Sequence, residues 1–240
     1  QGELGAYSHI AVNNLFKDAE ITTCATFEET FKKAYEDESY KIIIPIENSL
    51  AGRVADIHYL LPKYKLQIHG EYFLNVEHNL LCKPDAEIND IKFVRSHAQA
   101  IGQCQKIIHK NKFQPIISAD TAGSAKDLAE GNDKSIAAIA SDLSAKIYKL
   151  KILKKNIEDE KGNVTRFLIM GRNVQQPEYK KDKKYITTCI FRLKSKPSAL
   201  YKSLGGFATN QINMTKLESF SVKNTFAQTN FYLDFEGHLD

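Results

Sequence analysis

The chain is poor in the residues and runs that mark several protein classes: it has no tryptophan, only four cysteines and no long apolar stretch in 240 residues. A helix that crosses a membrane needs about 20 consecutive apolar residues, so a membrane protein is not expected. No basic segment followed by an apolar one stands at the start, so no export signal is expected. The cysteines form no CxxC pair, which favours reduced thiols in a cytoplasmic protein over a disulfide framework.

Motifs for nucleotides and metals are also missing. The sequence contains no GxxxxGK[ST] loop, no GxGxxG after a strand, no HExxH and no GxSxG. Its seven histidines have no metal-ligand spacing with cysteines or acids. The formal net charge is only +4, and the lysine cluster at 180–184 is typical of a solvated linker. We therefore expect no cofactor, no metal and no nucleic-acid partner.

What is present is a globular chain with 42% hydrophobic residues, long enough for one large domain or two smaller ones. Strand-like and helix-like apolar patterns alternate through the first 170 residues, which predicts an α/β fold with largely parallel sheets. The expected strands are residues 41–46, 66–74, 78–82, 91–95, 115–118, 135–140 and 164–170. The expected helices are residues 26–36, 52–61 (ended by Pro62), 97–111, 142–149 and one that ends at Glu130.

Near residue 172 the sequence changes character, and the polar, lysine-rich residues 173–184 are typical of a linker. We therefore expect one domain over 1–172 and a second over 185–240. The second domain has the β-α-β-β order that begins a ferredoxin-like unit. Because the last helix and strand of such a unit would follow Asp240, and Gln1 is not a methionine, we expect a chain trimmed at both ends. The elements expected in the second domain are strands over 185–193, 213–220 and 225–235 and a helix over 198–210.

Three segments place small polar residues between a short apolar strand and the start of a helix, and they contain Ser49, Ser96 and Thr121. In open α/β sheets such strand ends lie beside helix N-termini, whose unpaired N–H groups bind anions. For one such segment alone the better explanation is an ordinary N-cap, which stabilises a helix without any ligand. Three such segments in one domain favour a small anionic ligand in a cleft.

A Thr-Arg pair opens the last strand before the linker. Arg166 offers two parallel donors for a carboxylate, and the hydroxyl of Thr165 can give or take a proton. Taken alone, such a pair is more often an ordinary position on the surface of a sheet. Gln103 precedes Cys104, which has no activating base nearby in the sequence and is expected to be a packed thiol.

Four segments in this order carry the most specific pattern: Gly2–Ser8, Ile44–Val54, Ser96–Cys104 and Asn163–Phe167. They resemble the motif series of the prephenate dehydratase family, with the Pro-Ile-Glu-Asn-Ser and Thr-Arg-Phe motifs at the spacing of that family. The tail resembles the regulatory ACT domain of the same family, so the resemblance covers essentially the whole chain. The segments that carry this second likeness are Pro197–Leu200, Leu217–Ser219 and Asp234–His238.

The resemblance implies the conversion of prephenate to phenylpyruvate, CO2 and water in phenylalanine biosynthesis, without a cofactor. It implies a bilobed catalytic domain of two α/β lobes, like periplasmic binding proteins, with the site in the cleft between the lobes. By the same resemblance Thr165 acts at the leaving hydroxyl, while Asn48 and Gln103 orient and polarise the substrate. The residues implied to bind the substrate are Ser49, Ser96, Thr121, Arg166 and Phe167.

The small domain resembles one that binds phenylalanine between two copies, which implies feedback inhibition and a homodimer or homotetramer. The contacts implied for phenylalanine are Ala199, Leu200, Glu218 and Ser219.

Three alternatives stay open from the sequence. An arogenate dehydratase would act on a substrate that differs by an amino group on the side chain. A bilobed solute-binding protein would share the cleft, although it would usually carry an export signal. An amino-acid sensor would keep the second domain but not all three N-terminal motifs.

Overall fold

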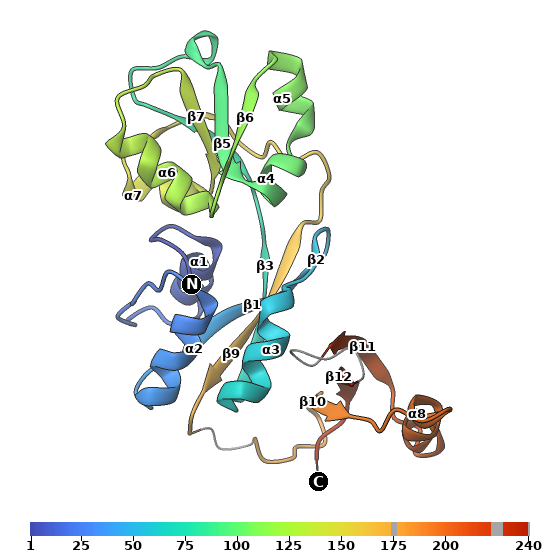
Figure 1. Ribbon diagram of the computed structural model, residues 1–240. Helices are drawn as coiled ribbons and strands as arrows, with labels where there is room; N and C mark the ends of the chain where they lie inside the picture. The colour runs from blue at the N-terminus through green and yellow to red at the C-terminus, as the bar shows by residue number, and fades with distance from the viewer. Residues whose placement is uncertain (174–176, 222–227, 240) are drawn as a thin grey trace. The chain divides into compact units, whose positions relative to one another are not determined.

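The computed structural model describes residues 1–173, 177–221 and 228–239. The chain divides into two compact units, residues 1–174 and 175–240, and the first unit consists of two lobes (Figure 1). Residues 174–176 of the expected linker and 225–227 of the expected last strand lie outside the described residues. In the part of the chain that the structure describes, no helix is long and apolar enough to cross a membrane.

The first lobe is built on a four-stranded sheet in the order β2-β1-β9-β3. Helix α1 lies against β1 and β3, and α2 contacts both β1 and α3. Ala11 of α1 is buried against Ile43, Leu74 and Phe167 on one face of the sheet. The elements are α1 (Tyr7–Leu15), α2 (Phe27–Glu36), β1 (Ile42–Asn48), β2 (Gly52–Arg53), α3 (Ala55–Tyr64), β3 (Gln67–Asn75) and β9 (Val164–Gly171).

The second lobe is built on a five-stranded sheet in the order β6-β5-β7-β4-β8. One apolar cluster contains Ile107 and Ile108 of α5, and another contains Ala125 and Leu128 of α6, so the sheet is covered on both faces. Burial on both faces explains why strand β7 is apolar throughout. The elements are β4 (Asn79–Cys82), a 3-10 turn (Ile88–Asp90), β5 (Phe93–His97), α4 (Ala98–Gly102), α5 (Gln105–Asn111), β6 (Gln114–Ser118), α6 (Thr121–Glu130), β7 (Ile136–Ala140), α7 (Asp142–Ile147) and β8 (Lys151–Lys154).

The α/β, two-lobed arrangement is confirmed, but the expectation of largely parallel sheets is wrong. Only β5 pairs in parallel, with β6 and with β7, among the described strands. Every pairing of β9 and β4 is antiparallel. The reason lies in the chain path: β3 leads out of the first lobe and β9 returns to it, so these neighbours run in opposite directions (Figure 1).

Two local expectations also differ from the structure, and some elements were not expected. Pro62 does not end its helix, because α3 continues to Tyr64 and ends where Lys65 takes a left-handed conformation at φ 51°. The expected helix over 97–111 is two helices, α4 and α5, separated at Gln103 and Cys104. Helix α1 and strand β8 had no expectation at all, since α1 is weakly amphipathic and β8 is only four residues long.

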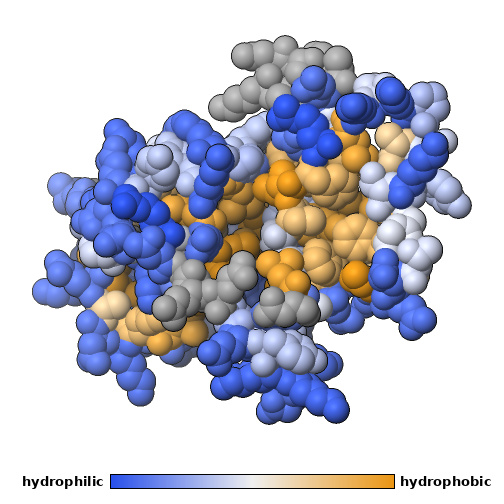
Figure 2. All heavy atoms as spheres, turned by 90° about the horizontal axis from the view of Figure 1, so that it is seen from below, coloured by the Kyte–Doolittle hydropathy of each residue, from blue (hydrophilic) through white to orange (hydrophobic). Residues whose placement is uncertain are grey.

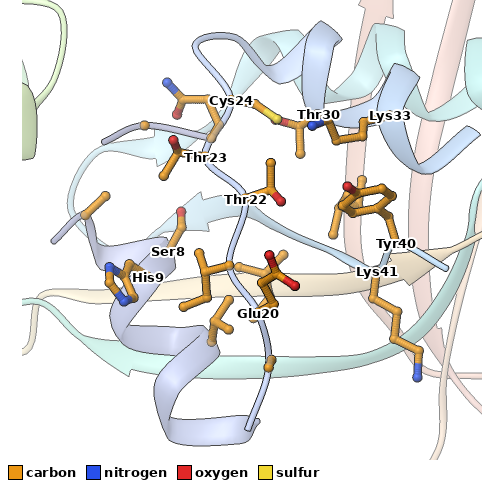
Figure 3. Close-up of a pocket in the computed structure, with 18 of the residues that line it drawn as sticks. Ser8, His9, Glu20, Thr22, Thr23, Cys24, Thr30, Lys33, Tyr40 and Lys41 are labelled. Atoms are coloured by element: carbon orange, nitrogen blue, oxygen red, sulfur yellow. The ribbon is translucent and has the colours of Figure 1, made fainter. Parts of the chain in front are cut away.

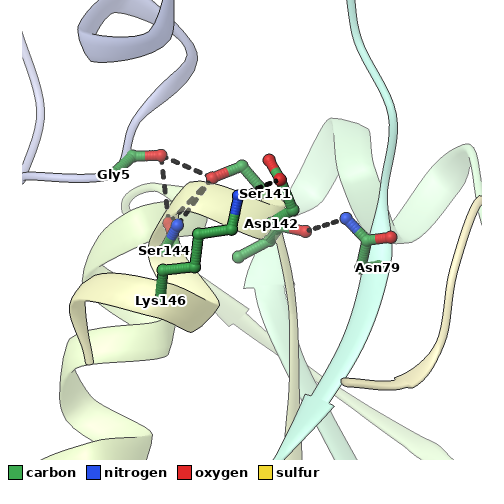
Figure 4. A network of polar contacts seen from close by, with 7 residues as sticks. Gly5, Asn79, Ser141, Asp142, Ser144 and Lys146 are labelled. Atoms are coloured by element: carbon green, nitrogen blue, oxygen red, sulfur yellow. Dashed lines mark hydrogen bonds and ion pairs between the residues drawn. The ribbon is translucent and has the colours of Figure 1, made fainter. Parts of the chain in front are cut away.

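A glycine connects the loop before α1 to the second lobe. Gly5 has φ +92°, and a Cβ at this position would stand 2.8 Å from the backbone Cα of Ser144. The carbonyl oxygen of Gly5 accepts hydrogen bonds from the hydroxyls of Ser141 at 2.6 Å and Ser144 at 3.0 Å (Figure 4). Because both serines belong to the N-terminal turn of α7, this contact fastens α1 to the second lobe.

The second unit has the expected β-α-β-β order and forms a three-stranded antiparallel sheet, β10-β12-β11. Phe220, Tyr232 and Leu233 are buried in it. Helix α8 has no fully buried residue, and the ring of Phe207 meets that of Phe235 at 5.4 Å. The elements are β10 (Ile186–Arg192), α8 (Ala199–Thr209), β11 (Met214–Ser221) and β12 (Thr229–Glu236).

Candidate active site

Asn48 and Thr165 meet where β1 and β9 pair, and Asn48 fixes the direction of the Thr165 hydroxyl. The Nδ2 of Asn48 donates to Oγ1 of Thr165 at 3.0 Å. Its Oδ1 accepts from the backbone N–H groups of Leu50 at 3.0 Å and Ala51 at 2.8 Å. Among the described residues, no acceptor takes the hydroxyl proton of Thr165, which is 8% exposed. The hydroxyl therefore has a proton to donate to a bound molecule.

Asn163 and Gln103 continue this polar cluster into the second lobe. Asn48 Nδ2 also donates to Asn163 Oδ1 at 2.7 Å, and Asn163 Nδ2 donates to Gln103 Oε1 at 2.9 Å. Gln103 sits at the break between α4 and α5, where its carbonyl accepts from the N–H of Asp159 at 2.7 Å. The break in the helix thus turns Gln103 toward the crossing between the lobes.

His78 and Tyr7 complete the cluster. The Nε2 of His78 lies 2.9 Å from Gln103 Oε1, and its Nδ1 lies 2.8 Å from the hydroxyl of Tyr7. Burial lowers the pKa of His78, although its hydrogen bond to Gln103 and the charge of Glu158 oppose that shift. Burial also raises the pKa of Tyr7 well above its usual range. Both side chains are therefore neutral at pH 7.

The three predicted anion-binding hydroxyls have different surroundings. Ser49 lies next to the cluster, but its hydroxyl donates to the carbonyl of Gly162 at 2.9 Å. Ser96 is fully buried, and its hydroxyl donates to the carbonyl of Ile139 at 2.7 Å. Thr121 is the first residue of α6, whose N-cap is Asp120. The structure does not bring Ser96 or Thr121 into the Asn48–Thr165 cluster.

Arg166 and Phe167 follow Thr165 on β9, and successive strand residues point to opposite faces. The Nε of Arg166 lies 2.7 Å from the carboxylate of Glu71 on β3, so this guanidinium is held by an acid. Phe167 is 1% exposed in the core beneath α1. Neither side chain joins the polar cluster: Arg166 lies on the other face, and Phe167 is packed.

The residues predicted to bind phenylalanine lie at the start of α8 and on β11. Ala199 and Leu200 open the helix and are half-buried. Glu218 forms an ion pair with Lys216 at 3.1 Å. Ser219, the next residue on β11, is exposed, so the two side chains point to opposite faces of the strand.

A cavity of about 520 Å³ lies elsewhere in the first lobe, between α1, α2, β1 and the segment around Thr22–Cys24 (Figure 3). None of the predicted site residues lines this cavity. Cys104 is fully buried, and burial raises the pKa of its thiol, so it is a packed thiol rather than a nucleophile. Across the described ranges, no group of three or more His, Cys, Asp or Glu residues could hold a metal ion.

A family model described as prephenate dehydratase matches residues 1–175. The chain belongs to the prephenate dehydratase family. The resemblance seen in the sequence is therefore confirmed, and with it the activity expected of this family, the dehydration and decarboxylation of prephenate in phenylalanine biosynthesis.

Relatives of known name support this membership over nearly the whole chain. A bifunctional N-acyl-homoserine lactone acylase/prephenate dehydratase of Komagataeibacter europaeus is 40% identical over 99% of this chain and 84% of its own length. An arogenate dehydratase/prephenate dehydratase of Arabidopsis thaliana is 36% identical over all of this chain and 65% of its own length. A crystal structure of prephenate dehydratase with L-Phe from Arthrobacter aurescens is 27% identical and has a TM-score of 0.90, over 99% of this chain and 79% of that one.

The sequence alone identified three of the six residues in the polar cluster of this prephenate dehydratase, namely Asn48, Gln103 and Thr165. The other three are Asn163, His78 and Tyr7. Asn163 could have been added, because it stands two residues before Thr165, and side chains two residues apart in an extended chain point to the same side. His78 and Tyr7 had no such signal, since each lies far in the sequence from its partners.

Proposed function

We propose that this chain converts prephenate to phenylpyruvate, CO2 and water, with Thr165 as the donor to the leaving hydroxyl. The observation that carries the proposal is the hydrogen bond from Asn48 to Thr165, at 3.0 Å, which occupies a lone pair of the hydroxyl and leaves its proton for the substrate. Loss of CO2 and hydroxide together creates an aromatic ring. The protein then has to supply mainly a proton donor at the departing oxygen and a site that does not retain the departing carboxylate.

Gln103 supplies a second donor in this proposal. Its Oε1 accepts from Asn163 and lies 2.9 Å from Nε2 of His78, so its NH2 group points elsewhere. That NH2 and the Thr165 hydroxyl are two neutral donors in one cluster. Neutral donors orient oxygen atoms without holding a carboxylate as firmly as a guanidinium does. This suits a reaction in which one carboxylate must leave as CO2.

The test is the replacement of Thr165 by valine, which keeps the branched shape of the side chain and removes the hydroxyl. We expect kcat to fall about 10²- to 10⁴-fold, the usual contribution of a positioned acid, with little change in KM. Phenylpyruvate formation from prephenate at neutral pH is the measurement. The control is Thr30→Val on α2, which removes another largely buried hydroxyl, one that donates to the carbonyl of Thr26 at 2.9 Å. Wild-type turnover by Thr165→Val would exclude this role.

Arogenate is the alternative substrate that stays open, and the name of the Arabidopsis thaliana relative includes both activities. The two substrates differ only at the side chain, as an amino or a keto group. Comparing kcat/KM for prephenate and arogenate on the same preparation decides between them.

We also propose that the second unit is an ACT regulatory domain that binds L-phenylalanine, with domains over 1–172 and 185–240 joined by 173–184. The order β10-β12-β11 supports a ferredoxin-like arrangement, because the third strand of that fold lies between the first and the second. The Arthrobacter aurescens relative was crystallised with L-Phe. The proposed contacts are Ala199, Leu200, Glu218 and Ser219. Calorimetric titration with L-phenylalanine tests this, and the absence of heat would count against it.

The proposed oligomer is a homodimer or homotetramer in the cytoplasm. Large apolar side chains are exposed in the second unit, with Tyr201 at 81% and Ile186 at 41%. Figure 2 shows apolar surface gathered into broad patches on the face seen from below. Broad apolar patches mark interaction surfaces in soluble proteins. Sedimentation equilibrium measures the state, and a monomer at micromolar concentration would overturn this part.

A further inference from the structure

The directions of the hydrogen bonds between Asn48, Asn163 and Gln103 follow from the backbone beside Asn48. Its side chain accepts two backbone N–H groups, from Leu50 and Ala51. Only an oxygen can accept, so the Oδ1 and Nδ2 of Asn48 are distinguished by chemistry alone. The NH2 of Asn48 must then donate to Asn163, 2.7 Å away, and that contact makes the facing atom of Asn163 an oxygen.

Since Oδ1 of Asn163 faces Asn48, its NH2 faces Gln103, whose nearest atom at 2.9 Å is therefore the acceptor Oε1. The ring of His78 approaches this same Oε1 at 2.9 Å through Nε2. Two acceptors would repel, so Nε2 of His78 carries the proton. In a neutral ring Nδ1 is then an acceptor, and the Tyr7 hydroxyl lies 2.8 Å from it and 2.8 Å from the carbonyl oxygen of Glu77, so these two acceptors share the one proton of that hydroxyl.

We propose that His78 is a positioning residue for the dehydratase reaction: its Nε2–H holds the oxygen of Gln103, so that the amide NH2 of Gln103 faces the substrate. The inference rests on the proposed function of the cluster. Without the His78 donor, rotation of the Gln103 amide by half a turn would sacrifice one hydrogen bond instead of two. His78 is 3% exposed, and its backbone N–H donates to the carboxylate of Glu158 at 3.0 Å. The His78 ring therefore has little freedom to follow a rotation of the Gln103 amide.

His78 also stands at the crossing between the lobes. Along the chain it lies between β3 of the first lobe and β4, the first strand of the second lobe. Tyr7, on α1 of the first lobe, meets its ring at a centroid distance of 5.7 Å and an interplanar angle of 73°. The His78 ring thus connects α1 to Gln103, because Tyr7 contacts its Nδ1 and Gln103 contacts its Nε2.

Two substitutions separate the two ring nitrogens. In His78→Gln the side-chain NH2 reaches the place of Nε2 and can still donate to Gln103. In His78→Asn the shorter amide reaches only the place of Nδ1 and keeps the contact with Tyr7. We expect His78→Gln to stay within about threefold of the wild type in kcat/KM for prephenate, and His78→Asn to lose about tenfold, the usual effect of one hydrogen bond. The control His109→Asn replaces an exposed histidine on α5 and leaves the rate unchanged.

Equal kcat/KM in the two His78 variants of an active enzyme overturns the inference and leaves the proposed function intact. A wild-type protein that forms no phenylpyruvate overturns both. A second measurement does not depend on activity or on the folding of the variants. Nitrogen NMR of the ¹⁵N-labelled wild type, with the His78 ring signals assigned by through-bond correlation to its backbone, shows which ring nitrogen carries the proton. A proton on Nε2 supports the inference, and a neutral ring protonated on Nδ1 refutes it.

Discussion

The replacement Asn48→Asp tests the cluster most directly, because it exchanges one NH2 group for an oxygen. The new carboxylate still accepts the backbone N–H groups of Leu50 and Ala51, so the loop after β1 keeps its hydrogen bonds. Both donations of Asn48 are lost, to Asn163 at 2.7 Å and to Thr165 at 3.0 Å. Thr165, which accepted a hydrogen bond in the wild type, now turns its own proton toward the carboxylate.

The size of the effect follows from that reversal. A hydrogen bond to a charged group contributes about 1.5–3 kcal/mol, and it must be broken before Thr165 can donate to the substrate. Since each 1.36 kcal/mol is tenfold in rate, kcat falls roughly 10- to 150-fold. The amide of Asn163 also rotates to donate to the carboxylate, which turns its oxygen toward Gln103 and reverses the amide there. His78 then faces an NH2 group and moves its proton to Nδ1.

Phenylpyruvate formation gives kcat and KM for Asn48→Asp, and Asn48→Ala is the matched variant. The alanine variant loses the loop hydrogen bonds but leaves the Thr165 proton free, so we expect the aspartate variant to be slower despite its better-preserved loop. ¹⁵N-histidine NMR of the aspartate variant should show the His78 proton on Nδ1. A kcat within twofold of the wild type, or an alanine variant slower than the aspartate variant, would refute this reasoning.

Three further outcomes concern stability. Gly5→Ala should lower the free energy of unfolding by at least about 1–3 kcal/mol in a urea titration, because the φ of Gly5 is +92° and the new Cβ would stand 2.8 Å from the backbone of Ser144. An unchanged urea midpoint would contradict this. Phe167→Ala, at a site 1% exposed, should cost about 3–5 kcal/mol in the same assay, and a loss below about 1 kcal/mol would mean that the site is not packed. Burial lowers the pKa of His78 below its value in the unfolded chain, so the contribution of His78 to the free energy of unfolding is complete above about pH 6.5 and is lost as the pH falls below that value. Between pH 7.5 and 5.5 the wild type should therefore lose more stability than His78→Gln. Equal losses in the two proteins would exclude the effect.

Local pattern predicted the elements well and their pairing poorly. The apolar run at Ile42–Ile46 and the apolar residues of β7 mark strands wherever they pair, because burial and β-branching act within a few residues. The direction of pairing depends on where the chain goes next, which no window of ten residues contains. The sheets are therefore mixed and antiparallel although the order of elements is that of parallel α/β proteins.

The same distinction holds for the candidate site. The sequence assigned both Thr165 and Arg166 to the substrate, whereas the structure pairs Arg166 with Glu71 on the neighbouring strand, because successive residues of β9 point to opposite faces. Ser96 and Thr121 match an anion-site pattern, but the same pattern suits a buried hydroxyl or the first turn of a helix. Their predicted contact with the substrate stays a prediction.

By itself, the sequence determined the family, the two-part organisation, the alternation of strands and helices, and three residues of the cluster, because each of these is carried by motifs or by short-range periodicity. Only the tertiary structure decided that Asn48 and Thr165, 117 positions apart, share a hydrogen bond, and that Tyr7, His78 and Gln103 extend it across the lobes. The physical reason is that a hydrogen bond acts over about 3 Å in space, whereas the sequence records only distance along the chain.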